Sequence, residues 1–302
     1  MKKIRVAILG AGKIGKYHVR EFSNLGAEVV AILGSSKQSS SETAKELGGE
    51  FNARVRPYHL LEELLGNEYL NAVSICTPPE MHENQIRLCL ERGLNVMCEK
   101  PLVQTSNNDY KTAEELFNLA EKRRKVLTVN TQWVSLVDYL RKNGNLDNLK
   151  NFSIYMEPGK IGIEMLKDHL PHANSILIRL IPEGKAEEIE FLLKTQEAAK
   201  VRFNYYTGEK TCAVKYSFKF KVDKPRQIFF SLNGETFKRE IGQEYKQVFI
   251  SSKRRFEIND PLRVSIDRFL EASQGSNTPL VNKNEILENI AITGQIISKY
   301  IS

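Results

Sequence analysis

The glycine-rich turn near the start of the chain constrains the fold more than any other stretch. An apolar run over residues 4–9 leads into Gly10-Ala11-Gly12-Lys13-Ile14-Gly15, and a helical pattern then runs over residues 14–25. A continuous apolar run is typical of a parallel strand covered on both faces. Strand, turn and helix in this order predict the opening unit of a doubly wound α/β domain, the context in which a G-x-G-x-x-G pattern is informative.

Alternation of strand and helix continues through the first 130 residues. Further strands are expected over residues 27–33, 71–76, 95–99 and 125–130, and helices over residues 39–47, 59–65, 81–92 and 109–121. Strict alternation indicates βαβ units with right-handed crossovers. Residues 1–128 are therefore expected to form an α/β domain of the Rossmann type.

The pattern changes after residue 151. Strand-like segments follow one another closely, residues 217–222 alternate apolar and polar side chains, and Asn233-Gly234 suits a type I′ hairpin turn. Helices are expected over residues 163–180, 261–272 and 284–301. Residues 129–260 should thus form an α+β domain on an open, mostly antiparallel sheet, and residues 261–302 should form C-terminal helices that pack back towards the Rossmann domain.

The composition and net charge of the chain limit the classes of partner that it is expected to bind. Of the 302 residues, 41% are hydrophobic and 27% are charged, which is ordinary for a globular protein of two domains. The net charge of +7 permits nucleic-acid binding, but the densest basic run, residues 122–125, follows an expected helix, and no motif of such binders is present. No apolar stretch reaches the roughly 20 residues that span a membrane. We expect neither nucleic acid nor membrane as a partner, and an anionic cofactor uses the positive charge equally well.

Cysteine usage points to a reducing compartment. Cys76, Cys89, Cys98 and Cys212 form no C-x-x-C pair, so neither a disulfide framework nor a zinc site is expected. Met1-Lys2-Lys3 resembles the start of a signal peptide, but the apolar run that follows is short and glycine-interrupted. A cytoplasmic protein is expected.

The glycine-rich turn predicts a dinucleotide site. Gly10 permits the tight turn, Gly12 lets the backbone approach a pyrophosphate, and Gly15 permits close packing of helix on strand. A site selective for NAD usually carries an acid at the end of the second strand. Here that position reads Ser35-Ser36-Lys37, which would accept a 2′-phosphate, so NADP is expected in preference to NAD. The alternative is a polar loop in which the lysine has no such role.

Three stretches carry a family resemblance: GAGKIGKYH (residues 10–18), AVSICTPPEMHENQI (72–86) and GLNVMCEKPL (93–102). With these motifs the chain resembles the Gfo/Idh/MocA superfamily of glucose–fructose oxidoreductase and inositol dehydrogenase. The resemblance implies a second domain that binds substrate and mediates oligomerisation through its open sheet, giving a homodimer or homotetramer. It also implies NAD(P)-dependent hydride transfer at a carbinol or carbonyl of a small sugar- or polyol-like substrate.

The resemblance also assigns candidate site residues. It places Lys100 at the end of its strand, facing nicotinamide and substrate, where it would stabilise negative charge on the reacting oxygen. It makes His172 the acid–base group, with Asp168 beside it. The cofactor is expected to contact the following residues: Gly10, Gly12, Lys13, Ile14, Gly15, Ser35, Ser36, Lys37, Thr77, Pro78, His82, Glu99 and Lys100.

Alternatives remain at the acid–base position. Asp168 and His172 could be an ordinary surface pair on a helix, or His169 could be the relevant histidine. They could also be two metal ligands, but no third ligand is identifiable, so no metal is expected. Pro171 could mark the helix start, since proline suits a first turn.

Some positions depart from the family pattern. Trp133 follows the last strand of the first domain where an arginine or tyrosine is common, and Ser175 replaces an acid found in sugar-acting members. These departures weaken the case for a simple sugar. Two rival functions stay open: a sensor or scaffold that binds NADP(H) without catalysis, and a reductase of C=N bonds.

Overall fold

A computed structural model describes residues 3–51, 54–104, 109–131, 133–142, 146, 148–208 and 210–302. Met1 and Lys2 of the signal-like start lie outside this range. The chain forms two compact units: Met1–Asn130 with Leu262–Lys283, and Thr131–Pro261 with Asn284–Ser302. Among the described residues, no helix is long and apolar enough to cross a membrane.

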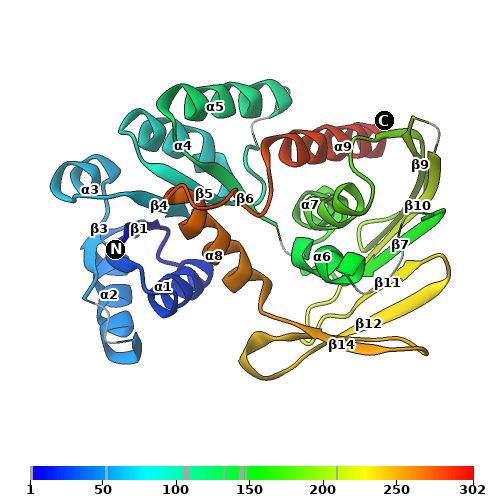
Figure 1. Cartoon of the computed structure of the whole chain (residues 1–302), viewed down its shortest axis with the longest axis horizontal. Helices are drawn as coiled ribbons and strands as arrows, with labels where there is room; N and C mark the ends of the chain where they lie inside the picture. The colour runs from blue at the N-terminus through cyan, green and yellow to red at the C-terminus, as the bar shows by residue number, and fades with distance from the viewer. Residues whose placement is uncertain are drawn as a thin grey trace. The chain divides into compact units, whose positions relative to one another are not determined.

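The first unit is built on a six-stranded parallel sheet with strand order β3-β2-β1-β4-β5-β6, which is the Rossmann order (Figure 1). Its strands are β1 (Arg5–Leu9), β2 (Glu28–Leu33), β3 (Arg56–Tyr58), β4 (Ala72–Ile75), β5 (Asn95–Glu99) and β6 (Leu127–Asn130). The sequence prediction of this sheet is confirmed, although the three-residue β3 was not anticipated.

Helices cover both sides of this sheet (Figure 1). They are α1 (Lys13–Asn24), α2 (Lys37–Phe51), α3 (Leu61–Asn67), α4 (His82–Glu91), α5 (Asp109–Arg123) and α8 (Pro261–Ser273), with a 3₁₀ turn, η1 (Pro79–Met81). Because the strands are buried on both faces, β1 is apolar almost throughout. Phe22 of α1 and Phe269 of α8 meet edge to face, with ring centroids 6.2 Å apart, within one hydrophobic core.

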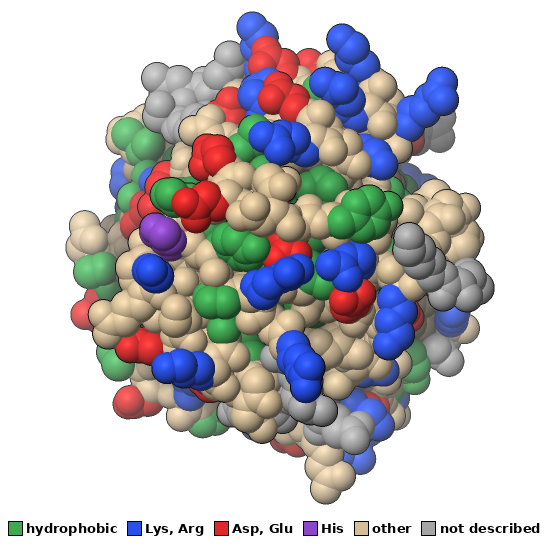
Figure 2. Space-filling model, turned by 90° about the vertical axis from the view of Figure 1, so that its left-hand side faces the viewer, with side chains coloured by type: hydrophobic (Ala, Val, Ile, Leu, Met, Phe, Trp, Pro, Cys, Tyr) green, Lys and Arg blue, Asp and Glu red, His purple; other side chains and the backbone are tan. Residues whose placement is uncertain are grey.

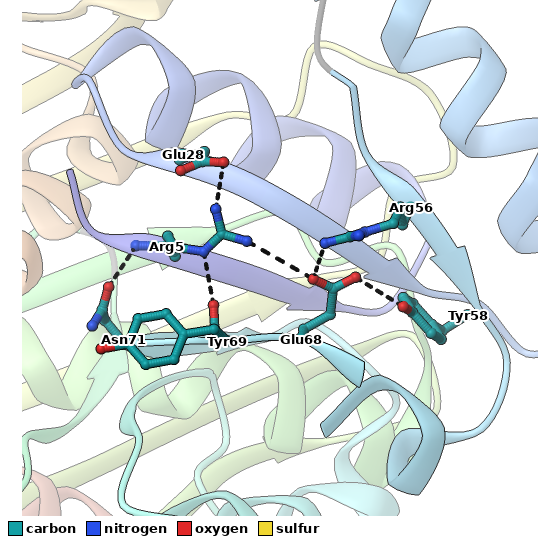
Figure 3. A network of polar contacts seen from close by, with 7 residues as sticks. All are labelled: Arg5, Glu28, Arg56, Tyr58, Glu68, Tyr69 and Asn71. Carbon is teal, nitrogen blue, oxygen red and sulfur yellow. Dashed lines mark hydrogen bonds and ion pairs between the residues drawn. The ribbon is translucent and has the colours of Figure 1, made fainter. Parts of the chain in front are cut away.

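A polar network closes the amino edge of the parallel sheet (Figure 3). It comprises Arg5, Glu28, Arg56, Tyr58, Glu68, Tyr69 and Asn71. The Glu68 side chain is fully buried, accepts a 2.8 Å hydrogen bond from the Tyr58 hydroxyl and pairs with Arg56. A buried carboxylate must be paired in this way. The network joins the starts of neighbouring strands and leaves the carboxyl edge to the loops described below.

The second unit is built on an eight-stranded sheet with strand order β14-β13-β12-β11-β7-β10-β9-β8. Its strands are β7 (Asn151–Met156), β8 (Lys185–Lys194), β9 (Ala198–Thr207), β10 (Lys210–Lys219), β11 (Ile228–Leu232), β12 (Glu235–Ile241), β13 (Gln247–Ile250) and β14 (Arg255–Ile258). Pairing is antiparallel except between β7 and β10. The predicted, mostly antiparallel sheet is confirmed, and Asn233 and Gly234 both take positive φ in the hairpin between β11 and β12.

One face of this sheet carries helices, and the other has exposed charged side chains. The helices are α6 (Val134–Lys142), α7 (Gly162–Leu180) and α9 (Lys283–Ile301); a 3₁₀ turn, η2 (Gln243–Tyr245), precedes β13. Aromatic side chains such as Phe152, Tyr216 and Phe230 are buried on the helix face. Lys215 and Arg202, which alternate with the buried residues along β10 and β9, are exposed.

Residues 261–302 were expected to form C-terminal helices that pack together back towards the Rossmann domain. The two helices instead belong to different units. In α8, Ile266 and Phe269 pack into the core of the first unit. In α9, Ile292 and Ile296 pack into the core of the second unit. The segment divides because the apolar stripes of the two helices are buried in different cores, and the division falls between Lys283 and Asn284.

Charged side chains are spread over the face seen in Figure 2. Lysine and arginine side chains lie there among acidic, apolar and other polar ones. On this face the positive net charge therefore does not gather in one place.

Candidate active site

The glycine-rich turn connects β1 to α1. Gly10 has φ +121°, and a Cβ there would lie 2.6 Å from the Cys76 carbonyl oxygen, while a Cβ on Gly15 would lie 1.9 Å from the Gly10 oxygen. Neither position admits a side chain. A Cβ on Gly12 would meet nothing within 4 Å, so the backbone there borders open space.

The start of α1 is a fitting cradle for a pyrophosphate. Gly12 precedes the first helical residue, Lys13, and no side chain caps the helix. The first backbone N–H groups of a helix have no partner within it, and they favour a negative charge. An open approach at Gly12 beside uncapped N–H groups fits a dinucleotide phosphate.

The end of β2 lies beside this turn, because the Gly10 N–H donates to the Leu33 oxygen over 2.9 Å. Ser35, Ser36 and Lys37 follow and are exposed. The Ser36 hydroxyl accepts a 3.1 Å hydrogen bond from the Ser39 N–H at the start of α2. The three predicted ribose-end residues are thus brought together at the same sheet edge as the glycines.

His82 joins the loops that follow β4 and β5. It is fully buried, with Nδ1 2.8 Å from the Pro101 carbonyl oxygen and Nε2 2.9 Å from the Thr77 carbonyl oxygen. Thr77 also donates its hydroxyl to Gln85 over 2.6 Å. Both ring nitrogens of His82 therefore lie against backbone oxygens, and the ring braces the Thr77-Pro78 turn against the turn that contains Lys100.

A buried polar cluster lies beneath Lys100. The His18 side chain is fully buried, with Nδ1 2.8 Å from the Ser74 hydroxyl and Nε2 3.0 Å from Glu99 Oε1. Asn130 donates to the same Glu99 oxygen over 2.6 Å. The cluster ties α1, β4, β5 and β6 together, and Glu99, with 17% of its side chain exposed, is the residue before Lys100.

Electrostatics make this cluster an ion pair. Burial alone would lower the pKa of His18, but hydrogen bonding and charge interaction with Cys76 and Glu99 raise it from 6.5 to about 10. Burial would likewise raise the pKa of Glu99, but His18 above all, together with Asn130 and Lys100, holds it below its ordinary value. A cationic histidine and an ionised carboxylate therefore share one buried site.

The acid–base candidates lie on α7 in the second unit. Asp168 Oδ2 is 3.2 Å from Nδ1 of His169, and the rings of His169 and His172 meet edge to face with centroids 6.3 Å apart. Ser175 donates its hydroxyl to the His172 carbonyl oxygen over 2.8 Å. All of these side chains share one stretch of helix, with the two histidines side by side.

The expectation that Pro171 could begin this helix is wrong. The helix begins at Gly162, whose φ of +59° and 2.7 Å bond from its N–H to the Gln196 oxygen shape the turn, and Pro171 lies inside. An internal proline removes one backbone hydrogen bond. Packing compensates: Pro171 is buried, and its carbonyl oxygen accepts a 2.8 Å bond from Asn289 of α9.

The predicted residues thus fall into two groups. The glycines, Ser35–Lys37, the Thr77 turn, His82 and Glu99-Lys100 gather at the carboxyl edge of the first sheet, whereas Asp168, His169 and His172 belong to the second unit. Within the described part of the chain, no three His, Cys, Asp or Glu side chains are grouped to hold a metal ion.

Sequence reasoning missed Ser74 and Asn130, which complete the cluster around His18 and Glu99. Both are polar residues in otherwise apolar strands, β4 and β6. A polar side chain in a doubly buried strand needs a buried partner. A polar residue within an apolar strand was therefore the sequence signal that could have identified Ser74 and Asn130.

This geometry is that of a nucleotide-binding Rossmann domain, and comparison with known proteins shows which family this domain is similar to. Residues 4–131 match the model of the Gfo/Idh/MocA oxidoreductase family, with an NAD-binding Rossmann fold. Inositol 2-dehydrogenase 1 of Paenarthrobacter aurescens is 31% identical over 127 residues, which are 41% of this chain and 36% of that protein. The likeness to this oxidoreductase family is thus shown for the Rossmann domain, and the match covers about a third of that relative's length.

Solved structures extend the likeness to the whole fold. UDP-N-acetylglucosamine 3-dehydrogenase of Acidithiobacillus ferrooxidans superposes with a TM-score of 0.78 at 17% identity, covering 100% of both chains. Myo-inositol 2-dehydrogenase of Lactobacillus plantarum gives a TM-score of 0.77 at 13% identity, covering 99% of this chain and 98% of that one. At these identities the likeness establishes the two-sheet architecture.

The His18–Glu99 pair predicts a pH dependence of stability. Because the pKa of His18 is raised, its contribution is complete below pH 6.5 and is lost as pH rises towards about 10. Because the pKa of Glu99 is lowered, its contribution is complete above its ordinary value of 4.5 and is lost at lower pH. Urea unfolding midpoints should therefore show the largest deficit of His18→Gln relative to wild type between about pH 4.5 and 6.5, shrinking by pH 10. The exposed His59 supplies the control His59→Gln, and a His18→Gln deficit that does not change with pH contradicts the ion pair.

Proposed function

We propose that this protein is an NAD(P)-dependent dehydrogenase or reductase that acts on a carbinol or carbonyl of a small polar substrate. The observation that carries the proposal is the open, uncapped helix start at Gly12 on the same sheet edge as Lys100. A phosphate cradle and a cationic group at the carboxyl ends of parallel strands suit a dinucleotide and a reacting centre side by side. The match of residues 4–131 to the oxidoreductase family supports the same reaction class.

Cofactor binding would use groups already in place. The N–H groups from Lys13 to Gly15 would hold the pyrophosphate, and Ser35–Lys37 would meet the adenosine ribose. Thr77, Pro78 and Glu99 would lie on the nicotinamide side. Bound NAD(P) supplies the hydride acceptor or donor.

Each proposed catalytic group has one task. Lys100 donates a hydrogen bond to the reacting oxygen and stabilises the negative charge that develops there. The buried His18–Glu99 pair fixes the strand end from which Lys100 projects. His172 exchanges the proton with the substrate hydroxyl, and Asp168 orients the histidine pair on α7.

The residues that follow β2 favour NADP over NAD. No carboxylate follows β2, and the exposed Lys37 offers a cation where a 2′-phosphate would lie. NADPH should therefore bind more tightly than NADH when each is titrated and nicotinamide fluorescence is followed. Lys37→Ala should weaken NADPH binding by about 10-fold and leave NADH binding unchanged, because a charge-assisted hydrogen bond contributes about 1.5–3 kcal/mol.

Lys45 lies further along α2 and is also exposed, so Lys45→Ala is the matched control. NADH binding as tight as that of NADPH would refute phosphate recognition by Lys37. Binding of neither nucleotide would refute the function itself.

Lys100→Met tests the chemistry. Turnover of a substrate found by screening polyols and sugar acids should fall at least about 100-fold, the usual effect of losing a group that stabilises developing charge. NADPH affinity should change little, because the pyrophosphate cradle is intact. Loss of affinity with unchanged turnover would contradict the catalytic role.

Controls complete this assay. Lys111→Met removes an exposed lysine of α5 and should leave turnover unchanged. His172→Gln and His169→Gln in the same assay identify the acid–base group: the larger loss, with a changed pH profile, marks it, and a larger loss at His169 would replace His172 in the mechanism.

We further propose that two or four copies associate through the helix-free face of the second sheet. Its strands β8, β9 and β10 are each 10 residues long, and the exposed Arg202 and Glu190 pair across that face at 2.5 Å. Light scattering should return a multiple of the chain mass. The mass of a single chain would exclude the association.

A further inference from the structure

Arg239, on the helix face of β12, is a guanidinium with no carboxylate partner. Its Nη2 donates to the Arg226 carbonyl oxygen over 2.8 Å, and its Nε is buried without a hydrogen-bond acceptor among the described residues. Within that part of the chain no acidic side chain forms an ion pair with it. Burial lowers the pKa of Arg239, yet arginine stays charged in proteins. A partly desolvated charge without a counter-charge is costly, and an anionic ligand would offset that cost.

The ring of Trp133 packs against this guanidinium. The Arg239 guanidinium carbon lies 5.2 Å from the centre of the Trp133 ring, which is 3% exposed. That ring in turn meets Phe249 edge to face at 6.0 Å. Trp133 has φ +81°, which is unusual for a bulky residue and persists only where the surroundings enforce it. The charge therefore rests on a rigid aromatic platform and not on a mobile side chain.

Arg239 also lies in the same cross-strand row of the sheet as Phe218, the residue next to the histidines. The register of β11 and β12 places Phe229 opposite Lys238, so continuing it by one residue places Arg239 opposite Ile228. Ile228 pairs with Met156, and Met156 pairs with Phe218. The ring of His169 lies 6.4 Å from that of Phe218. Arg239 and the histidine pair therefore share one face of one sheet.

The separation suits a small ligand. Three strand spacings of about 4.8 Å each place Arg239 roughly 14 Å from Phe218 along the sheet. A ligand held by both groups has to bridge only the part of this distance that the arginine and histidine side chains do not cover. A single guanidinium matches one carboxylate in charge and, through its planar fork, in shape.

We infer that Arg239, supported by Trp133, is a binding subsite for a carboxylate carried by the substrate, which would make that substrate a small hydroxy acid or sugar acid. The identification of the ligand as a substrate rests on the proposed function. The carboxylate subsite itself concerns binding alone. It also accounts for the departure at Trp133, whose ring here supports the arginine.

Trp133 is the chain's only tryptophan, so its fluorescence reports directly on the subsite. Purified full-length protein is titrated with D-gluconate and with L-tartrate, and separately with myo-inositol as the uncharged probe and with sulfate. A saturable change with at least one of the two carboxylates, and none with myo-inositol, is expected. Arg239→Gln should raise the carboxylate concentration at half-saturation at least about 10-fold, as loss of a charge-assisted pair does.

Arg254 offers a matched control, because it too lies over an aromatic ring, Phe237, at 5.1 Å, but it is paired with Glu235 at 3.2 Å. Arg254→Gln should leave the titration unchanged. Arg239→Lys, which keeps the charge and loses the fork, serves if Arg239→Gln fails to fold, and should weaken binding at least about 3-fold.

Three results overturn the inference: no response to either carboxylate, an equal response to myo-inositol or sulfate, or a carboxylate response that Arg239→Gln and Arg239→Lys leave unchanged. Carboxylate binding that depends on Arg239, in a protein that binds no nucleotide, would uphold the subsite and refute only the proposed oxidoreductase activity.

Discussion

The buried contact between His18 and Glu99 is the constraint on which the first site depends. Glu99 ends β5, and its carboxylate is held by a histidine from α1 and by the amide of Asn130 from β6. One carboxylate therefore holds α1, the end of β5 and the neighbouring strand β6 together. The frame is electrostatic, because removing either charge would leave the other buried and uncompensated.

His82 performs a similar task with backbone groups. Its two ring nitrogens hold the turn after β4 and the turn after β5. Together the two histidines hold the backbone on both sides of Lys100, as the role proposed for that lysine requires.

Local sequence patterns predicted much of this structure. The six-stranded sheet, the glycine turn and the change to antiparallel pairing follow from hydrophobic periodicity and turn chemistry, which act over a few residues. The three-residue β3 was missed because it is short and contains Pro57, and proline disfavours a strand. Pro171 was misplaced because its cost is offset by a contact from α9, more than a hundred residues away in sequence. The partners of Glu99 and the position of Arg239 over Trp133 could not be predicted for the same reason: both depend on tertiary pairing. Only the polar residues within apolar strands hinted at the first of them.

The chain crosses between its two units three times, near residues 130, 261 and 283. During synthesis, the whole eight-stranded sheet therefore leaves the ribosome before α8 does. Until then the first core lacks Ile266 and Phe269, and the apolar surface of Phe22 and its neighbours has no cover from that helix. Domains commonly fold in order from the N-terminus. Here most of the second unit is made before the first unit receives residues 262–283, and the second unit must then wait for α9.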